Sequence, residues 1–141
     1  MKSRIIVLST LVLVLAGCND QLILAPRPVA PTSCRPPAEL TAMVTGQPNA
    51  LIDMRSPLQH AADKMSTALG LHADAVALRD FTAALVGDIA ASRMDDACRH
   101  LTSAFGALKA LPDTPATLPD RDGIRLILAL TSQALAAVMG P

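Results

Sequence analysis

Residues 92–111 have the sequence SRMDDACRHLTSAFGALKAL, and they decide the fold. Their apolar side chains recur every three or four positions, the spacing of one face of an α-helix. Asp95 and Asp96 fall in the first turn, where carboxylates favour the positive end of the helix dipole. Ser92 either ends the preceding helix or, with Asp95, forms an acidic variant of a capping box. We predict a helix over residues 93–111 whose buried face consists of Met94, Cys98, Leu101, Phe105 and Leu108.

The preceding helix is predicted over about residues 74–91. Its apolar stripe consists of Leu78, Phe81, Leu85 and Ile89. Arg79, Asp80 and Asp88 are expected to lie away from that stripe.

A third helix is predicted further upstream, over about residues 57–69. Ser56 and Pro57 are typical of a helix start, since serine caps free N–H groups and proline fits the first helical position. Gly70 supplies the stop. The apolar face of this helix is expected to consist of Leu58, Ala61, Ala62, Met65 and Leu69. A single turn of helix is predicted before it, within residues 38–44.

The last helix is predicted over about residues 120–139, after the break made by Pro112 and Pro115. One face is expected to carry Ile124, Ile127, Leu128, Leu135 and Val138, and Leu126 and Leu130 widen it. No charge follows Arg125, so this helix is either central to a bundle or partly covered by a partner. Its alanine, threonine, serine and glutamine content favours a core helix over a membrane span.

These patterns predict an all-α fold, a small four-helix bundle-like domain over residues 38–141. The proline-rich residues 18–37 are predicted to form an extended tether, at about 3.1 Å per residue. Within this tether, the apolar residues 21–25 are expected to dock on the domain or to lie at a lipid surface.

The N-terminus carries the pattern of an export signal. Lys2 and Arg4 precede an apolar run of eleven residues, Ile5 to Leu15, which is too short as a helix to span a bilayer. The run ends in Leu15-Ala16-Gly17-Cys18, which resembles a bacterial lipobox. This resemblance implies cleavage of residues 1–17, lipidation of Cys18, and a mature protein tethered to a membrane outside the cytoplasm.

Assigning Cys18 to lipid leaves two of the three cysteines, Cys34 and Cys98, as a pair. An oxidising compartment favours a disulfide between them, with two free thiols as the alternative. Such a bond would close a long loop, which stabilises the fold by about 4 kcal/mol in the chain-entropy description. It would also hold the end of the tether against the core.

Charge and composition argue against nucleic-acid binding. Removal of Lys2 and Arg4 leaves ten basic against 12 acidic residues, so the mature chain is slightly acidic. The chain has no Trp or Tyr and only two Phe, so it lacks platforms for base stacking.

Candidates for catalysis or metal binding are few, and we expect no enzyme, metal or cofactor. His60, His72 and His100 lack the spacing of a zinc pair, although His60 and Asp63 can meet on one helix. Asp120-Arg121-Asp122-Gly123 resembles the middle of a calcium loop, but both outer ligand positions are apolar, so we interpret it as a helix cap. The serines lack a nucleophile elbow, and Glu39 is the single glutamate.

The lipobox, tether, small helical domain and disulfide together resemble the overall plan of secretin pilotins. The resemblance implies a non-catalytic adaptor or assembly factor at the periplasmic face of the outer membrane, with a helical groove for an envelope protein. In known lipoprotein sorting, which this N-terminus resembles, Asp directly after the lipidated cysteine favours retention in the inner membrane. That position is Asn19 here, and Asp20 comes next, so the resemblance implies the outer membrane. As an alternative, residues 34–40, CRPPAEL, are similar to proline-rich segments of phage-type spanin or exclusion lipoproteins. An enzyme or a small-ligand binder is the third hypothesis.

Overall fold

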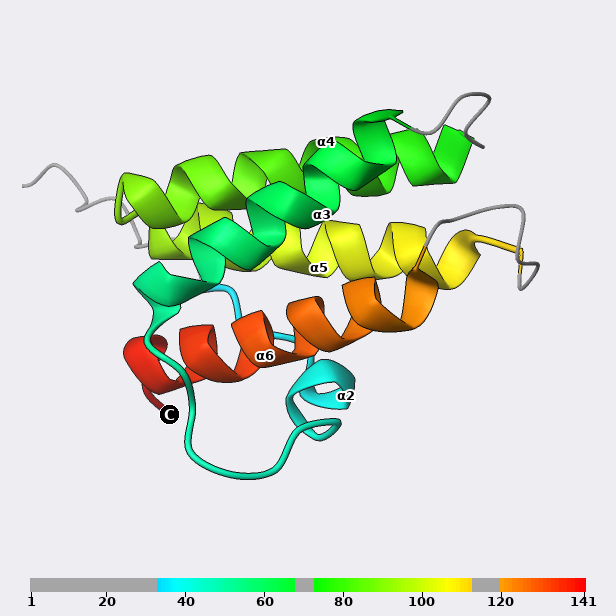
Figure 1. Cartoon of the computed structure of the whole chain (residues 1–141). Helices are drawn as coiled ribbons and strands as arrows, with labels where there is room; N and C mark the ends of the chain where they lie inside the picture. Colours follow the sequence, from blue (N-terminus) through cyan, green and yellow to red (C-terminus); the bar gives the residue numbers. More distant parts are fainter. Residues whose placement is uncertain (1–32, 68–72, 113–119) are drawn as a thin grey trace, which may run out of the picture. The chain divides into compact units, whose positions relative to one another are not determined.

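Five α-helices and one short 3-10 helix make up the described part of the chain (Figure 1). The structure is a computed structural model that describes residues 33–67, 73–112 and 120–141. The helices are α2 (Ala38–Thr41), η1 (Leu51–Met54), α3 (Arg55–Thr67), α4 (Ala73–Ala90), α5 (Met94–Ala110) and α6 (Arg121–Met139). Across those three ranges there is no β-strand, and the predicted all-α fold is confirmed.

Several predictions fall outside the described residues. These are the signal peptide 1–17, the lipobox with Cys18, the tether as far as residue 32, the end of the first predicted long helix at Leu69 and Gly70, and His72. The compact unit is Ser33–Pro141, so it begins five residues before the predicted domain start at residue 38. The difference arises because Cys34 is joined to α5.

The bundle is built around the pair α4 and α5, which are neighbours in both sequence and space (Figure 1). Helix α3 packs on α4, and α6 packs on α5. Helix α2, η1 and α3 also contact α6, so this last helix lies among other elements of the same unit. By length and composition α6 is the one candidate membrane span among the described residues, yet seven of its residues are buried within the bundle. This agrees with its prediction as a core helix.

A tight turn at Ser92 joins α4 to α5. Ser92 N donates to Ile89 O at 3.2 Å, and Arg93 N donates to Asp88 O at 2.9 Å. Ser92 itself has φ +57°, so it takes the left-handed position that commonly ends a helix. Of the two interpretations of Ser92, the helix end is therefore confirmed. The capping box is wrong, because the residue before α5 is Arg93 and no side chain caps that helix.

The start of α3 also differs from the prediction. Helix η1 runs directly into Arg55, so Ser56 and Pro57 lie within the first turn of α3 and Ser56 is not its N-cap. Proline is tolerated there, because first-turn N–H groups have no partner inside the helix. The sequence pattern missed η1, which adds the buried side chains of Leu51 and Met54 to the core.

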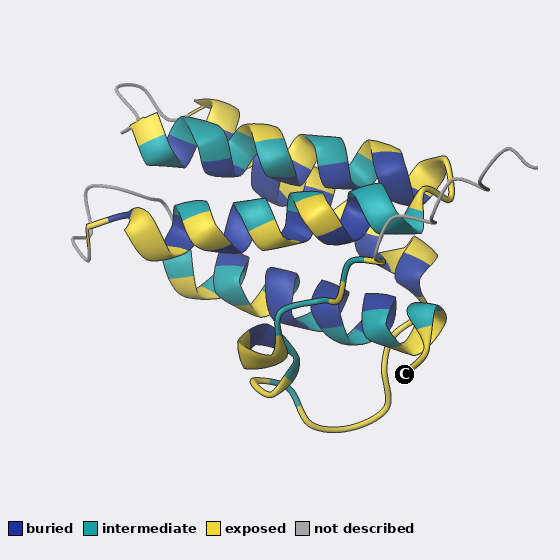
Figure 2. Ribbon diagram, turned by 180° about the vertical axis from the view of Figure 1, so that it is seen from behind, coloured by how far each residue is buried: buried dark blue, intermediate teal, exposed yellow. Residues whose placement is uncertain are grey.

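Most of the predicted apolar stripes form the core (Figure 2). The buried members include Leu58, Met65, Leu78, Leu85, Ile89, Cys98, Leu101, Phe105, Leu108, Ile124, Leu128 and Leu135. Three predictions are wrong: Asp88 is buried rather than off the stripe, and Leu126 and Val138, expected on the apolar face of the last helix, are 51% and 57% exposed. Asp88 follows Leu85 by three positions, so helical spacing turns it inward, whereas Val138 lies in the last turn of α6 at the rim of the bundle.

Candidate functional site

The chain is fixed to the bundle at the first turn of α5. The Sγ atoms of Cys34 and Cys98 lie 2.05 Å apart, as the predicted disulfide requires. Cys34 N also donates to Asp95 Oδ1 at 3.3 Å, so the backbone is held one turn from the disulfide. Together these bonds set the course of the chain between Cys34 and α2.

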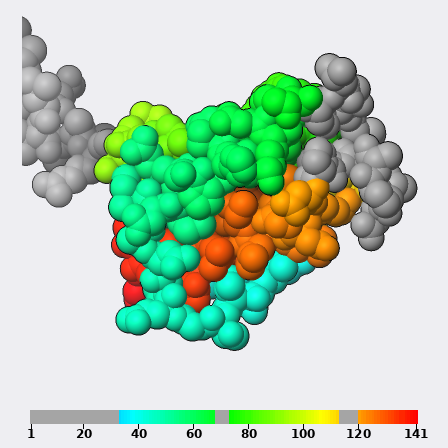
Figure 3. Space-filling view, in the orientation of Figure 1, coloured from blue at the N-terminus to red at the C-terminus, as the bar shows by residue number. Residues whose placement is uncertain are grey.

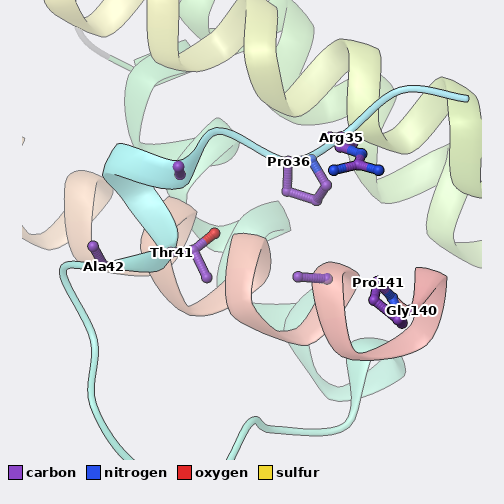
Figure 4. A pocket seen from close by; sticks show the side chains of 8 residues that line it. Arg35, Pro36, Thr41, Ala42, Gly140 and Pro141 are labelled. Atoms are coloured by element: carbon purple, nitrogen blue, oxygen red, sulfur yellow. The ribbon is translucent and has the colours of Figure 1, made fainter.

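This course creates an apolar concavity, the α2–α6 groove, with a volume of about 420 Å³ (Figure 4). One wall is the segment of Arg35 and Pro36, a second is α2, and the third is the end of α6. Its lining consists of Arg35, Pro36, Ala38, Thr41, Ala42, Ala136, Gly140 and Pro141. Figure 3 shows the residues around α2 in cyan, directly beside the orange and red residues of α6.

Helix α2 is held firmly although it has only four residues. Leu40 is fully buried, and Thr41 Oγ1 lies 2.9 Å from Ser132 Oγ on α6. The Thr41 hydroxyl also donates to Pro37 O at 3.1 Å. The wall of the groove formed by α2 is therefore fixed in place, by the buried side chain of Leu40 and by the polar contact of Thr41 with α6.

The chemistry of the α2–α6 groove suits an apolar segment of another protein. Most of the lining side chains are alanine, glycine or proline, so the backbone of a bound segment can approach closely. The exposed residue Arg35 places a guanidinium at the edge, where it can pair with a carboxylate of the bound segment.

A second feature is an ion-pair cluster between α4 and α5 that is built on the buried carboxylate of Asp88. The Asp88 carboxylate, 4% exposed, accepts hydrogen bonds from Arg93 Nη2 at 2.7 Å and Nε at 3.1 Å. Its other oxygen lies 2.5 Å from His100 Nδ1. Burial alone raises the pKa of Asp88, but the hydrogen bonds and charges of His100 and Arg93 outweigh it and lower the pKa below its usual value.

Sequence reasoning placed His100 among scattered histidines and missed this cluster. The available signal was the spacing of Asp88 from Leu85, which puts a carboxylate on the buried face and demands a partner. His100 contacts Asp88 and stacks near Phe81, with ring centroids 6.3 Å apart. These contacts join α4 to α5, so we interpret the cluster as structural.

The remaining predicted site residues are on separate elements. His60 lies exposed on α3, where Asp63 accepts a hydrogen bond from Gln59 Nε2 at 2.8 Å. Asp120 caps α6 by accepting from Gly123 N at 3.3 Å, as the helix-cap interpretation predicted. Among the residues with described positions, no group of three or more His, Cys, Asp or Glu side chains is arranged to hold a metal ion.

Comparisons with protein-family models, with curated proteins and with solved structures found no match for this chain.

Proposed function

We propose that this protein is a lipid-anchored lipoprotein of the cell envelope that acts as a non-catalytic adaptor or assembly factor. In this proposal Cys18 carries the lipid, and the α2–α6 groove binds an apolar segment of an envelope protein. We place the protein at the periplasmic face of the outer membrane. The pilotin-like plan makes a segment of an outer-membrane secretin the first partner to test.

The observation that carries the proposal is the position of the disulfide. A Cys34–Cys98 bond supports export, because such bonds persist in oxidising compartments. The same bond fixes the position of Arg35 and Pro36, which line the α2–α6 groove. These two residues directly follow Cys34, where the stretch of chain that begins at Cys18 reaches the domain. In an anchored domain of this kind, the groove would lie at a fixed position next to the point where the tether joins the domain.

The anchor is tested with Cys18→Ser in the full chain. We expect the wild-type protein to incorporate labelled palmitate and to fractionate with membranes. Without the thiol no lipid can be attached, so the variant should be unlabelled and should leave the membrane fraction. A variant that stays with membranes would contradict the lipid anchor.

The α2–α6 groove is tested with a charged side chain on its wall. Ala42 is exposed and lines the groove, so Ala42→Glu should leave the core intact while placing a carboxylate where the apolar segment binds. Ala83 is an exposed alanine on α4 outside that lining, so Ala83→Glu is the matched control. The lipidated proteins are used to pull down a detergent-solubilised secretin of the same cell.

Capture should fail for Ala42→Glu and persist for Ala83→Glu. Equal capture by both variants would reject the α2–α6 groove as the binding site. Deletion of the gene should leave the secretin misplaced or unassembled, and normal secretin assembly in that strain would reject the pilotin-like role.

A further inference from the structure

A second apolar concavity lies at one end of the bundle, where four elements meet. It has a volume of about 270 Å³ and is lined by Leu51, Ile52, Ile89, Ser92, Met94 and Val138. These residues belong to η1, the end of α4, the turn to α5, the start of α5 and the end of α6. We call this surface the end patch.

Two side chains make the end patch unusual. Ile52 is 56% exposed and Val138 is 57% exposed, whereas Leu51 and Ile89 beneath them are buried. Ile52 also borders a neighbouring concavity, but its other lining residues, Asp53, Arg55, Ser56, Gln59 and Val86, are mostly polar, so the apolar surface ends at Ile52 on this side. Within the described ranges, these two are the most exposed large apolar side chains.

The end patch lies at the end of the bundle where the chain joins the compact unit. Cys34 is bonded to Cys98, and its backbone N–H contacts Asp95, the residue after Met94 of the patch. The 15 residues 18–32 therefore connect the proposed lipid on Cys18 to this end of the domain. A lipid surface is the one partner that such an anchor keeps continuously within reach.

The charges around the end patch are compatible with the interfacial zone of a bilayer. Arg93, 55% exposed, follows Ser92. On the other side, the exposed Asp53 follows Ile52 and the exposed Arg55 follows η1, so one negative and one positive charge lie there. Arginine side chains can keep their charge among lipid head groups while their stems cover apolar surface. The carboxylates nearest Arg93, Asp88 and Asp96, are paired with it at 2.7 and 3.7 Å.

We infer that the end patch rests on the lipid surface to which the protein is anchored, with Ile52 and Val138 entering the head-group region. This inference rests on the proposed anchor at Cys18. Two aliphatic side chains give weak contact on their own, so the contact depends on the tether, which keeps the domain close to the membrane. The domain is thereby oriented and does not tumble at the end of its tether.

The experiment compares three exposed positions on the full-length lipidated protein. Ile52→Cys and Val138→Cys report on the end patch, and Leu126→Cys is the matched control, because Leu126 is 51% exposed. Leu126 lies twelve residues before Val138 on α6, about 18 Å along the helix axis. Each thiol is labelled with a polarity-sensitive fluorophore, and circular dichroism checks that each variant keeps its helix content.

The labelled proteins are reconstituted into protein-free vesicles of phosphatidylethanolamine and phosphatidylglycerol that carry nitroxide lipids. We expect a blue-shifted emission and quenching at positions 52 and 138 at least about twofold stronger than at 126, because only the first two would enter the head-group region. Equal, weak quenching at all three positions would overturn the inference and leave the end patch to a protein partner.

A second arm separates this inference from the proposed anchor. The Cys18→Ser chain is attached through an N-terminal polyhistidine tag to vesicles with nickel-chelating lipids, so tethering no longer requires lipidation. Quenching at positions 52 and 138 but not 126 would support contact of the end patch even if Cys18 is not lipidated in the cell. Uniform weak quenching in this arm would reject the contact whatever the state of Cys18.

Discussion

The two ends of the bundle are held together by different interactions. We call the end with the Cys34–Cys98 disulfide the tethered end and the opposite end, where α6 begins, the distal end. At the distal end, Arg121 at the start of α6 donates from Nη2 to Leu108 O at 3.1 Å and from Nη1 to Leu111 O and Pro112 O at 3.1 and 3.0 Å. Lys64 lies 3.8 Å from Asp120 across the same end. At the tethered end, a disulfide and the Asp88 cluster fix the chain, and two aliphatic side chains remain exposed.

The distal end is therefore stabilised entirely within the domain, whereas the tethered end keeps apolar side chains exposed for contact with other molecules. At the distal end the charged groups satisfy backbone carbonyls that α5 leaves free, so that end is closed within the domain. At the tethered end a covalent bond provides the closure, and apolar side chains remain available to other molecules. The following substitutions test whether stability and contact are divided between the ends in this way.

The largest expected effect follows removal of the disulfide. The double variant Cys34→Ser, Cys98→Ser should lower the free energy of unfolding by about 4 kcal/mol, since the bond closes a loop between cysteines 64 positions apart. Thermal unfolding followed by circular dichroism measures the loss. Hydrogen exchange should increase first at α2 and the start of α5, and Cys18→Ser should have no such effect. An equal increase in hydrogen exchange at both ends would contradict the idea that the disulfide stabilises mainly the tethered end.

Asp88→Asn should have the next largest effect, a loss of about 1–3 kcal/mol. The amide keeps the size of the side chain, but it is uncharged and replaces one of the two carboxylate oxygens that contact Arg93 and His100. Chemical denaturation at neutral pH measures the loss. Asp80→Asn is the control, because Asp80 is exposed on the same helix.

The pH dependence of stability gives a second measurement on Asp88. Its pKa is lower in the folded protein than in the unfolded chain, because the hydrogen bonds and charges of His100 and Arg93 outweigh the effect of burial. The resulting stabilisation is complete above the ordinary carboxyl pKa of about 4 and is lost as the pH falls through the lower folded value. Asp88→Asn should therefore flatten the acid side of the stability curve. An unchanged acid side would show that other carboxyl groups govern it.

Arg121→Ala tests the distal end, with an expected loss of about 1–2 kcal/mol. The guanidinium donates to three carbonyl oxygens, but part of that network faces solvent, which reduces its contribution. Lysine has one ammonium group and cannot span three acceptors in the same way, so Arg121→Lys should recover little. Full recovery by lysine would mean that charge alone matters at this end.

The smallest expected effect comes from the cap of α6. Asp120→Ala should lose about 1 kcal/mol, because the Gly123 N–H loses its acceptor. Asp120→Asn should keep most of the stability, since asparagine also caps helices and also tolerates the left-handed conformation, here φ +53°. Urea midpoints measure both variants. Equal losses would indicate that the negative charge, through its ion pair with Lys64, is what stabilises this end.

Periodicity predicted the long helices well, because apolar spacing determines which face each helix buries. The buried faces of α3 and α5 follow the predicted residues, and the described ends of the long helices lie within two positions of the predicted ones. The Cys34–Cys98 pairing was also predicted, by an argument from cysteine number and compartment rather than from spacing.

The misses have physical reasons. Asp88 was excluded from the buried stripe by its charge, although its spacing from Leu85 placed it there and His100 and Arg93 compensate it. The α2–α6 groove could not be predicted, since its walls come from residues 35–42 and 136–141, which are brought together by α2 packing on α6. Such a concavity depends on how elements pack and leaves no signal in local sequence.

The disulfide has one further consequence, which concerns mechanical force. If residue 18 is anchored and a partner pulls on the end of α6, the tension enters the domain at Cys34 and crosses directly to Cys98 on α5. The chain between these cysteines, which contains α2, η1, α3 and α4, is bypassed and cannot be stretched. Within the folded unit only the segment beyond Cys98 can extend, so under load α6 would separate from the bundle while the chain between the two cysteines keeps its length.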